Sequence, residues 1–166
     1  MGKRRYVIIM AAGSGTRMGA PLPKQFLEMH GKPVIIYTLE HFEYHPDIDN
    51  IVIVCLADWI EELRGLLKRY GILKVTQIVP GGETGHDSIY NGLLAMRSTN
   101  KEEDIVLIHD GVRPLINEEL ILKNIQAYRQ PDIKKQHHNL ICCDAVFVFL
   151  RQSRVIYNCF GDFIYN

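Results

Sequence analysis

The sequence lacks three features that would point at once to a class of protein: a long apolar run, an excess of charge and a metal-binding cysteine pattern. No segment approaches the roughly 20 apolar residues that cross a bilayer. The 19 lysines and arginines balance 19 aspartates and glutamates, so no charge excess favours nucleic acid or a membrane surface as a partner. Cys142 and Cys143 are adjacent, which suits neither a CxxC redox pair nor a zinc site. We therefore expect a reduced, cytoplasmic protein.

The composition is that of a globular protein. The 166 residues, 47% of them hydrophobic, fit one domain that can bury a core. The first residues, MGKRRYVIIMAAG, superficially resemble a signal peptide because a basic segment precedes a short apolar one. A glycine-rich loop ends that apolar run within a few residues, so we interpret it as a first strand.

The most informative segment is Tyr6 to Gln25, YVIIMAAGSGTRMGAPLPKQ. Its apolar start is typical of a buried strand. Gly13 and Gly15 then allow positive φ angles and let backbone N–H groups converge on an anion. Ser14 and Thr16 add hydroxyl groups. The loop therefore has the features of a phosphate-binding turn.

Two cations accompany this loop. Arg17 offers a planar fork suited to phosphate oxygens, and Lys24 carries a compact charge on a flexible stem. The loop taken alone is equally compatible with an ordinary β-to-α turn that has solvated basic residues. Nucleotide chemistry is the hypothesis to test against the rest of the sequence.

Two common nucleotide-binding motifs do not fit. A dinucleotide fingerprint needs a third glycine where this chain has Met18, and a helix directly after the loop. Pro21, Pro23 and Pro33 prevent a helix from starting there. A Walker A string is absent. The dinucleotide and P-loop hypotheses are therefore both weakened.

Strand and helix patterns alternate along the chain. Apolar runs predict strands at 7–10, 51–56, 75–79 and 105–108, and helical spacing predicts helices at 34–44, 59–70, 87–96 and 118–128. Asp87 or Ser88 is expected at the start of the third helix, and Asn117 is expected to cap the fourth. A further strand is predicted at 145–150. This order predicts an α/β fold with a mostly parallel, Rossmann-like sheet and helices on both faces.

In such a sheet, ligands bind beyond the carboxyl ends of the strands, which directs attention to two more loops. The segment PGGETGHDS includes Gly82 and runs into a helix N-terminus, where anions bind favourably. Viewed alone, it is also compatible with a plain loop with a serine or aspartate cap. It is a second candidate for ligand contact.

The third loop, HDGVRP, directly follows a buried strand. Asp110 is well placed there to hold Mg²⁺ against phosphates. Arg113 has two alternatives, a clamp for a second anionic substrate or a partner for a neighbouring acid. For His109 we favour a hydrogen-bonded structural role over that of a catalytic base.

Taken together, the three segments MAAGSGTRM…LPKQFL, PGGETGHDSIYNGL and IHDGVRP resemble one family. Its motif series is LAAGxGxRM…PKQ, GGxxRxDSV and HDAARP, found in the cytidylyltransferases that act on sugar-alcohol phosphates. The family includes 2-C-methyl-D-erythritol 4-phosphate and ribitol-5-phosphate cytidylyltransferases. The resemblance covers about residues 5 to 130 and implies a GT-A-like nucleotidyltransferase fold.

The resemblance also implies a reaction and a set of roles. CTP and a polyol phosphate would give the CDP-polyol and pyrophosphate with Mg²⁺ as cofactor, as one step of isoprenoid precursor synthesis for methylerythritol phosphate or of cell-wall polymer synthesis for ribitol phosphate. Catalysis is assigned to Arg17 and Lys24, and the metal to Asp110. Arg113, near the loop of Asp110, is assigned to substrate binding. The nucleotide is assigned to Ala11, Ala12, Gly13, Ser14, Gly15, Thr16, Gly82, Asp87 and Ser88.

The chain also departs from the family pattern. Gly85 stands where members commonly have an arginine, and HDGVRP replaces HDAARP, which looks nearer to the ribitol-type branch. After Arg129 no family motif is visible, including the arm used for homodimer contacts. We therefore divide the chain into a nucleotide-binding domain at 1–130 and an atypical tail at 131–166. A truncation, following a change of reading frame near residue 130, is our hypothesis for the tail.

Three functional hypotheses follow. The first is a cytidylyltransferase, with weak or no turnover expected from this polypeptide because the acceptor half of the site has no match. The second is a non-catalytic CTP-binding remnant of the same family. The third is a Rossmann-like oxidoreductase, which the missing third glycine and the prolines argue against.

Overall fold

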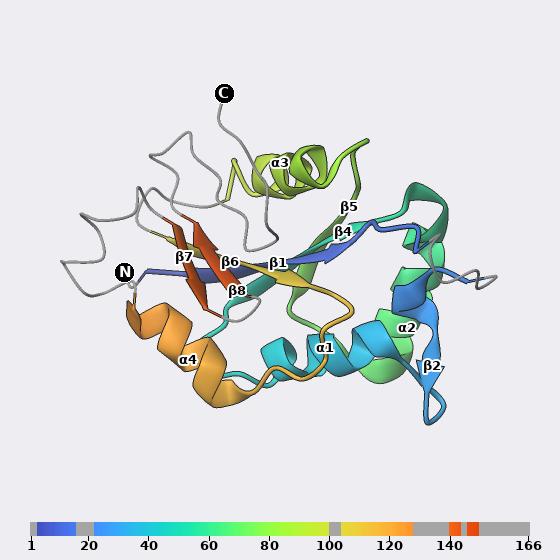
Figure 1. Cartoon of the computed structure of the whole chain (residues 1–166), viewed down its shortest axis with the longest axis horizontal. Helices are drawn as coiled ribbons and strands as arrows, with labels where there is room; N and C mark the ends of the chain where they lie inside the picture. The colour runs from blue at the N-terminus through green and yellow to red at the C-terminus, as the bar shows by residue number, and fades with distance from the viewer. Residues whose placement is uncertain (1–2, 16–21, 100–103, 128–139, 144–145, 150–166) are drawn as a thin grey trace.

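The protein is built around one twisted sheet. The computed structural model describes residues 3–15, 22–99, 104–127, 140–143 and 146–149 (Figure 1). A six-stranded sheet has the order β5-β4-β1-β6-β8-β7. Its strands are β1 (Arg5–Ala11), β4 (Asn50–Cys55), β5 (Val75–Pro80), β6 (Ile105–Asp110), β7 (Leu140–Cys143) and β8 (Val146–Phe149). The first four strands are mutually parallel, so the predicted mostly parallel sheet is confirmed.

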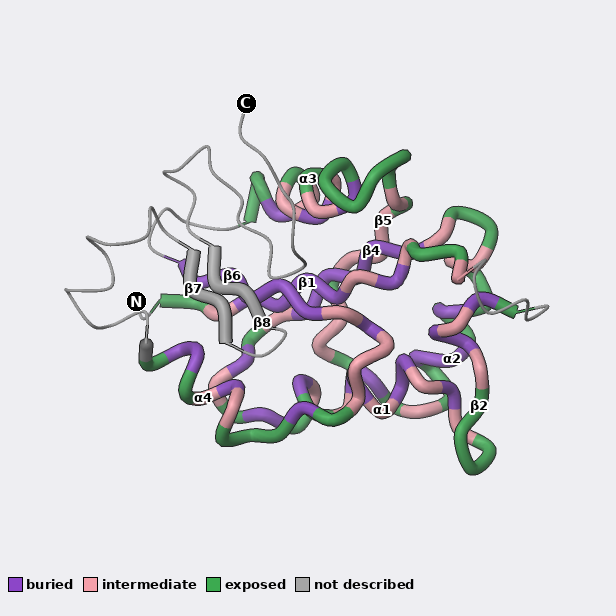
Figure 2. The backbone as a smooth tube through the Cα atoms, in the orientation of Figure 1, coloured by how far each residue is buried: buried purple, intermediate pink, exposed green. Residues whose placement is uncertain are grey.

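Helices cover both faces of this sheet, as predicted. One face carries α1 (Val34–Glu43), α2 (Ile60–Tyr70) and α4 (Glu118–Ala127), and the other carries α3 (Gly85–Ala95) (Figure 1). Each face has its own core cluster: Val7 and Ile9 pack with α1, α2 and α4, whereas Ile8 packs with the partly buried Ile89 of α3. The purple central strands in Figure 2 show that β1, β4 and β6 are largely buried, whereas β5 at the edge of the sheet is only partly buried.

Strand residues alternate between the two faces, and the register decides which side chain goes where. In β6, His109 pairs with Ile9 and Asp110 pairs with Met10. Ile9 belongs to the cluster under α1, and Met10 packs against the cluster under α3. The alternation therefore places His109 and Asp110 on opposite faces.

The helix ends follow simple chemistry, with one correction. Gly71 ends α2 in the left-handed conformation with φ 68°. Asn117 Oδ1 accepts a hydrogen bond from the Leu120 N–H at 2.8 Å, as expected of a cap on α4. The third helix begins at Gly85 with Thr84 as its N-cap, so the expectation of Asp87 or Ser88 at its start was wrong. Asp87 instead occupies the third helical position of a capping box.

Short elements connect the parallel strands. A one-turn helix, η2 (Lys24–Phe26), follows the first loop, and a small antiparallel pair, β2 (Glu28–Met29) and β3 (Lys32–Pro33), precedes α1. A second short turn, η3 (Ala57–Trp59), leads into α2.

The late strands extend the sheet beyond β6. β8 pairs antiparallel with β6, and β7 pairs antiparallel with β8. The strand predicted at 145–150 is thus confirmed as β8, whereas β7 was not predicted. No helix in the described ranges combines the length and apolar character of a membrane span.

The close approach of α3 to the sheet gives a stability prediction. A Cβ added at Gly92 would lie 2.9 Å from Cγ2 of both Ile8 and Val54, whereas a Cβ at the exposed Gly65 of α2 would meet nothing within 4 Å. Gly92→Ala should lower the free energy of unfolding by about 1–3 kcal/mol through overpacking. Gly65→Ala, the matched control, should raise it by about 0.5–1 kcal/mol through helix propensity. Urea unfolding of both variants measures this, and equal stabilisation by both would contradict the described packing.

Candidate functional site

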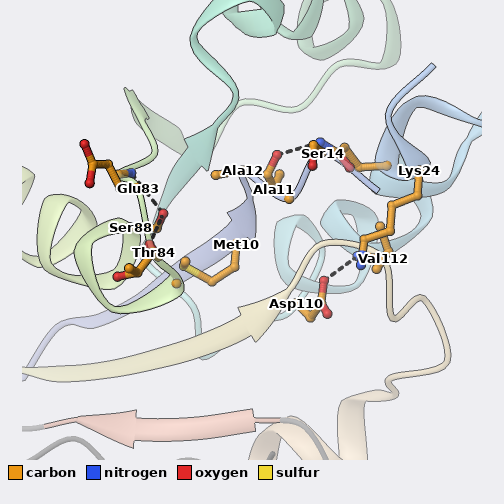
Figure 3. A pocket seen from close by; sticks show the side chains of 14 residues that line it. Met10, Ala11, Ala12, Ser14, Lys24, Glu83, Thr84, Ser88, Asp110 and Val112 are labelled. Atoms are coloured by element: carbon orange, nitrogen blue, oxygen red, sulfur yellow. Dashed lines mark hydrogen bonds between the residues drawn. The ribbon is translucent and has the colours of Figure 1, made fainter. Parts of the chain in front are cut away.

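A cavity of about 350 Å³ lies at the carboxyl ends of the parallel strands. The ends of β1 and β6, the turn η2, and the loop between β5 and α3 supply its lining residues (Figure 3). These are the three loops singled out in the sequence, which parallel pairing brings to one edge of the sheet. The cavity volume is that of an ordinary small-molecule site.

The first loop wraps one side of this cavity. Ala11, Ala12, Gly13 and Ser14 all line it, immediately after the end of β1. Gly15 has a φ of 66°, the left-handed conformation that glycine adopts readily, but does not line the cavity. Thr16 and Arg17 lie outside the described residues, so their predicted roles stay predictions.

Lys24 stands next to this loop. A Cβ added at Gly13 would lie 3.8 Å from Lys24 Cε, and one added at Gly15 would lie 3.3 Å from the Lys24 backbone nitrogen. Lys24 is the one cationic side chain among the lining residues of the described part. A flexible ammonium beside a glycine loop can follow a phosphate that moves during reaction.

The second loop folds tightly against the first. An added Cβ at Gly81 would clash with Ala12 Cβ, and one at Gly82 would clash with Asp87 Cβ, so both positions need glycine. The Ser88 hydroxyl accepts a hydrogen bond from the Gly82 N–H at 3.0 Å and donates one to the Thr84 carbonyl at 2.9 Å. Ser88 and Gly82 both line the cavity, and the hydroxyl of Ser88 holds the turn that presents Gly82.

Asp87, predicted to contact the nucleotide, does not line the cavity. Its carboxylate accepts hydrogen bonds from the Thr84 hydroxyl at 2.7 Å and the Thr84 N–H at 3.0 Å. These two bonds lower the pKa of the Asp87 carboxyl below its ordinary value. In this structure the Asp87 carboxylate stabilises the start of α3 through its two hydrogen bonds with Thr84.

Gly85 lines the cavity where the family pattern commonly has an arginine. A Cβ added there would meet nothing within 4 Å. The space for a side chain is therefore present, and the nearest lining cation of the described part comes from Lys24 on a different loop.

The third loop places Asp110 at the cavity and holds it there. Its Oδ1 accepts a hydrogen bond from the Val112 N–H at 3.1 Å (Figure 3), and its Oδ2 lies 3.5 Å from Arg113 Nε. Arg113 does not line the cavity, so of the two alternatives the pairing with a neighbouring acid is the one observed. A carbonyl of the same turn, that of Gly111, accepts a hydrogen bond from the Thr38 hydroxyl of α1 at 2.9 Å.

His109 is confirmed as a structural residue. It is buried on the α1 face, where its ring meets that of Phe42 edge to face at 5.3 Å. Its Nε2 lies 3.0 Å from the Arg113 carbonyl oxygen. The imidazole therefore braces the loop that carries Asp110, and His109 is not among the described residues that line the cavity.

Some lining residues were missed by sequence reasoning. Met10, Gln25, Glu83 and Val112 line the cavity without having been assigned a role. Gln25 belongs to the LPKQ motif that supported the family resemblance, so that motif could have drawn attention to it. The other three lie within or beside the three loops, and only the folded geometry shows that they face inward.

The three loops share a small set of chemical capabilities. They offer backbone N–H groups at a glycine turn and at the N-terminus of α3, one lining ammonium group from Lys24, and two lining carboxylates, from Asp110 and Glu83. Such a site can bind a polyphosphate and a divalent cation together.

Comparisons with known proteins agree with this interpretation. The family model described as IspD, 2-C-methyl-D-erythritol 4-phosphate cytidylyltransferase, matches residues 6–136. A ribitol-5-phosphate cytidylyltransferase of Vibrio parahaemolyticus serotype O3:K6 (strain RIMD 2210633) is 49% identical over 144 residues, which cover 86% of this chain and 58% of that protein. A 2-C-methyl-D-erythritol 4-phosphate cytidylyltransferase of Clostridium botulinum (strain Langeland / NCTC 10281 / Type F) is 45% identical over 127 residues, 76% of this chain and 54% of that protein.

The fold has solved relatives as well. The crystal structure of 4-diphosphocytidyl-2C-methyl-D-erythritol synthase from Anaerococcus prevotii DSM 20548 matches with a TM-score of 0.62 and 35% identity, covering 77% of this chain and 52% of that one. This chain spans a little over half the length of these relatives. Since the Vibrio match covers 86% of the chain, similarity extends beyond residue 130, although the domain boundary placed there stays a prediction.

The capping box gives a prediction on pH. Thr84→Ala removes the hydroxyl that donates to Asp87, so the pKa of the Asp87 carboxyl should rise toward its ordinary value of about 4. Because the folded pKa is depressed, the bonds of ionised Asp87 stabilise the parent protein above that ordinary value and lose this effect as the pH falls through the folded pKa. Carboxyl titration by NMR in parent and variant measures the change. An unaltered Asp87 pKa in Thr84→Ala would contradict the capping box.

Proposed function

Because this chain belongs to the 2-C-methyl-D-erythritol 4-phosphate cytidylyltransferase family, we propose that it binds CTP and transfers its cytidylyl group to a polyol phosphate. The observation that supports this best is the meeting of three loops at one cavity, with Lys24 and Asp110 both lining it. A nucleotidyl transfer needs a phosphate cradle, a mobile cation and a metal-binding carboxylate in one place, and these residues supply them.

In the proposed reaction, a phosphate oxygen of the acceptor attacks the α-phosphorus of CTP in line with the bond to the β-phosphate. A new P–O bond forms as the α,β-bridging bond breaks, and pyrophosphate leaves with the bonding electron pair. No covalent enzyme intermediate is needed. The protein would supply positioning and charge stabilisation.

Each loop has a proposed part in this step. The backbone N–H groups of the segment from Ala12 to Gly15 would bind the triphosphate, and Lys24 would stabilise the charge that develops on the α-phosphate and on pyrophosphate. Arg17, from the same loop, is proposed as a second cation. The turn at Gly82, held by Ser88, would contact the cytidine portion.

The residues present fit a magnesium ion that arrives with the nucleotide. Among the described residues no cluster of three or more metal-binding side chains exists, so a resident all-protein metal cage is absent from that part. Mg²⁺ commonly uses one or two carboxylates together with substrate phosphates. We propose that Asp110 provides that carboxylate and that the bound ion neutralises phosphate charge. The ion would compete with Arg113 for Asp110 Oδ2, which lies only 3.5 Å from the guanidinium.

Two acceptors are proposed, each on its own observation. The description of the matching family favours 2-C-methyl-D-erythritol 4-phosphate and a role in isoprenoid precursor synthesis. The 49% identity to the Vibrio protein favours ribitol 5-phosphate. A CTP-binding protein without turnover is the alternative for a chain that spans little more than half of its relatives.

An assay of binding and turnover separates these functions. We expect CTP with Mg²⁺ to bind, as measured by titration calorimetry, and NAD to show no comparable affinity because the dinucleotide fingerprint is missing. Pyrophosphate release is then followed with each acceptor in turn, and the ratio of the two kcat/KM values assigns the substrate. CTP binding with no release from either acceptor would identify the binding-only protein, and the absence of CTP binding would overturn the proposed function.

Lys24 gives a sharper mutational prediction. Lys24→Met keeps much of the side-chain length and removes the charge, so the dissociation constant for CTP should rise about 10- to 100-fold with the loss of one charged contact to phosphate. Lys68→Met, on the exposed surface of α2, is the matched control and should change it less than about twofold. Equal affinities in both variants would remove Lys24 from the nucleotide site.

A further inference from the structure

Gln25 is an unusual residue for the position that it occupies. It lies in η2 directly after Lys24, lines the cavity, and is completely buried. Its Nε2 donates a 2.7 Å hydrogen bond to the backbone carbonyl oxygen of Ala11, the last residue of β1. This bond joins η2 to the carboxyl end of a central strand of the sheet.

Stability alone does not account for a glutamine here. Its Oε1 is buried and has no hydrogen-bond partner within the described part of the chain. A buried polar atom without a partner costs free energy, and an apolar side chain of similar size would avoid that cost. Departures of this kind from simple packing rules are typical of functional positions.

The neighbours of Gln25 indicate that its bond to Ala11 affects the position of Lys24. Phe26, the last residue of η2, is buried and stacks on Trp59 with ring centroids 4.7 Å apart. The Gly15 position packs against the Lys24 backbone. The turn that carries Lys24 is therefore held in two ways. Phe26 stacks on Trp59, a contact that any apolar core could provide, and Gln25 donates a directional hydrogen bond to Ala11.

We propose that Gln25 is a positioning residue, which holds Lys24 at the glycine loop through its hydrogen bond to Ala11. This inference rests on the proposed function, because it concerns how the lysine meets a nucleotide. Loss of the bond lets η2 shift relative to β1, and the ammonium then loses its alignment with the phosphates. Gln25 itself contacts no substrate in this proposal, and its effect passes through Lys24.

A double-mutant cycle tests that dependence. Gln25→Met keeps the volume and removes the donor, and the CTP dissociation constant is measured with Mg²⁺ in the parent, Gln25→Met, Lys24→Met and the double variant. We expect Gln25→Met to weaken CTP about fivefold to tenfold in the parent. In the Lys24→Met background it should weaken CTP less than about twofold, because the group that it positions is gone.

A matched control is available in Gln77. Its Nε2 donates a 3.0 Å hydrogen bond to the Ala95 carbonyl oxygen, the same kind of bond at the far end of α3 from the cavity. Gln77→Met should leave the CTP dissociation constant within about twofold of the parent. If Gln25→Met fails to fold, Gln25→Asn replaces it, since the shorter amide keeps its polarity but does not reach Ala11.

The outcomes are distinct. Weakening by the Gln25 variant in the parent and not in the Lys24→Met background supports the proposal. No weakening, or equal weakening in both backgrounds, overturns it and leaves the proposed function standing. A parent protein that does not bind CTP overturns the proposed function and this inference together.

Discussion

Parallel pairing of β1 with both β4 and β6 is the constraint on which the rest of the structure depends. It brings the ends of the central strands to one edge, so three loops far apart in sequence share one cavity. The register also assigns faces, since Met10 pairs with Asp110 and Ile9 with His109. A slip of one residue would bury the carboxylate under α1 and turn the imidazole toward the cavity. The chemistry of the site therefore depends on the same hydrogen bonds that build the core.

Close backbone contact is the second requirement of the site. Gly81 meets Ala12, and Gly82 meets Asp87, with no room for a side chain at either glycine. The Ser88 hydroxyl accepts a hydrogen bond from the Gly82 N–H and thereby holds Gly82 in place. These contacts join the two loops into one continuous wall of the cavity, an arrangement in which backbone N–H groups could act as fixed dipoles toward the proposed ligand.

The sequence predicted the sheet, its helices and the three loops because each depends on local signals: apolar runs, helical spacing and glycines. For Asp87 it left both a nucleotide contact and an aspartate cap open, because the two look alike until the start of the helix is known; the structure shows the capping box. It did not predict β7, whose pairing with β8 is a long-range choice that the local pattern of Leu140–Cys143 does not specify. For Gln25, the motif drew attention to the segment, and only the folded geometry revealed the bond to Ala11.

The site divides its polar groups into those that shape the loops and those that face the cavity. Asp87 and His109 form hydrogen bonds within the loops, whereas Thr84 and Ser88 both line the cavity and hold the turn. Lys24 is different, because its long stem leaves the ammonium mobile while its backbone is held between Gly15 and the neighbouring Gln25 and Phe26. A mobile charge on a fixed base can stay with a phosphate as it moves from substrate to product, whereas a rigid cation would favour only one of the two. In the proposed reaction, the attachment of η2 to the end of β1 would determine where this charge can act.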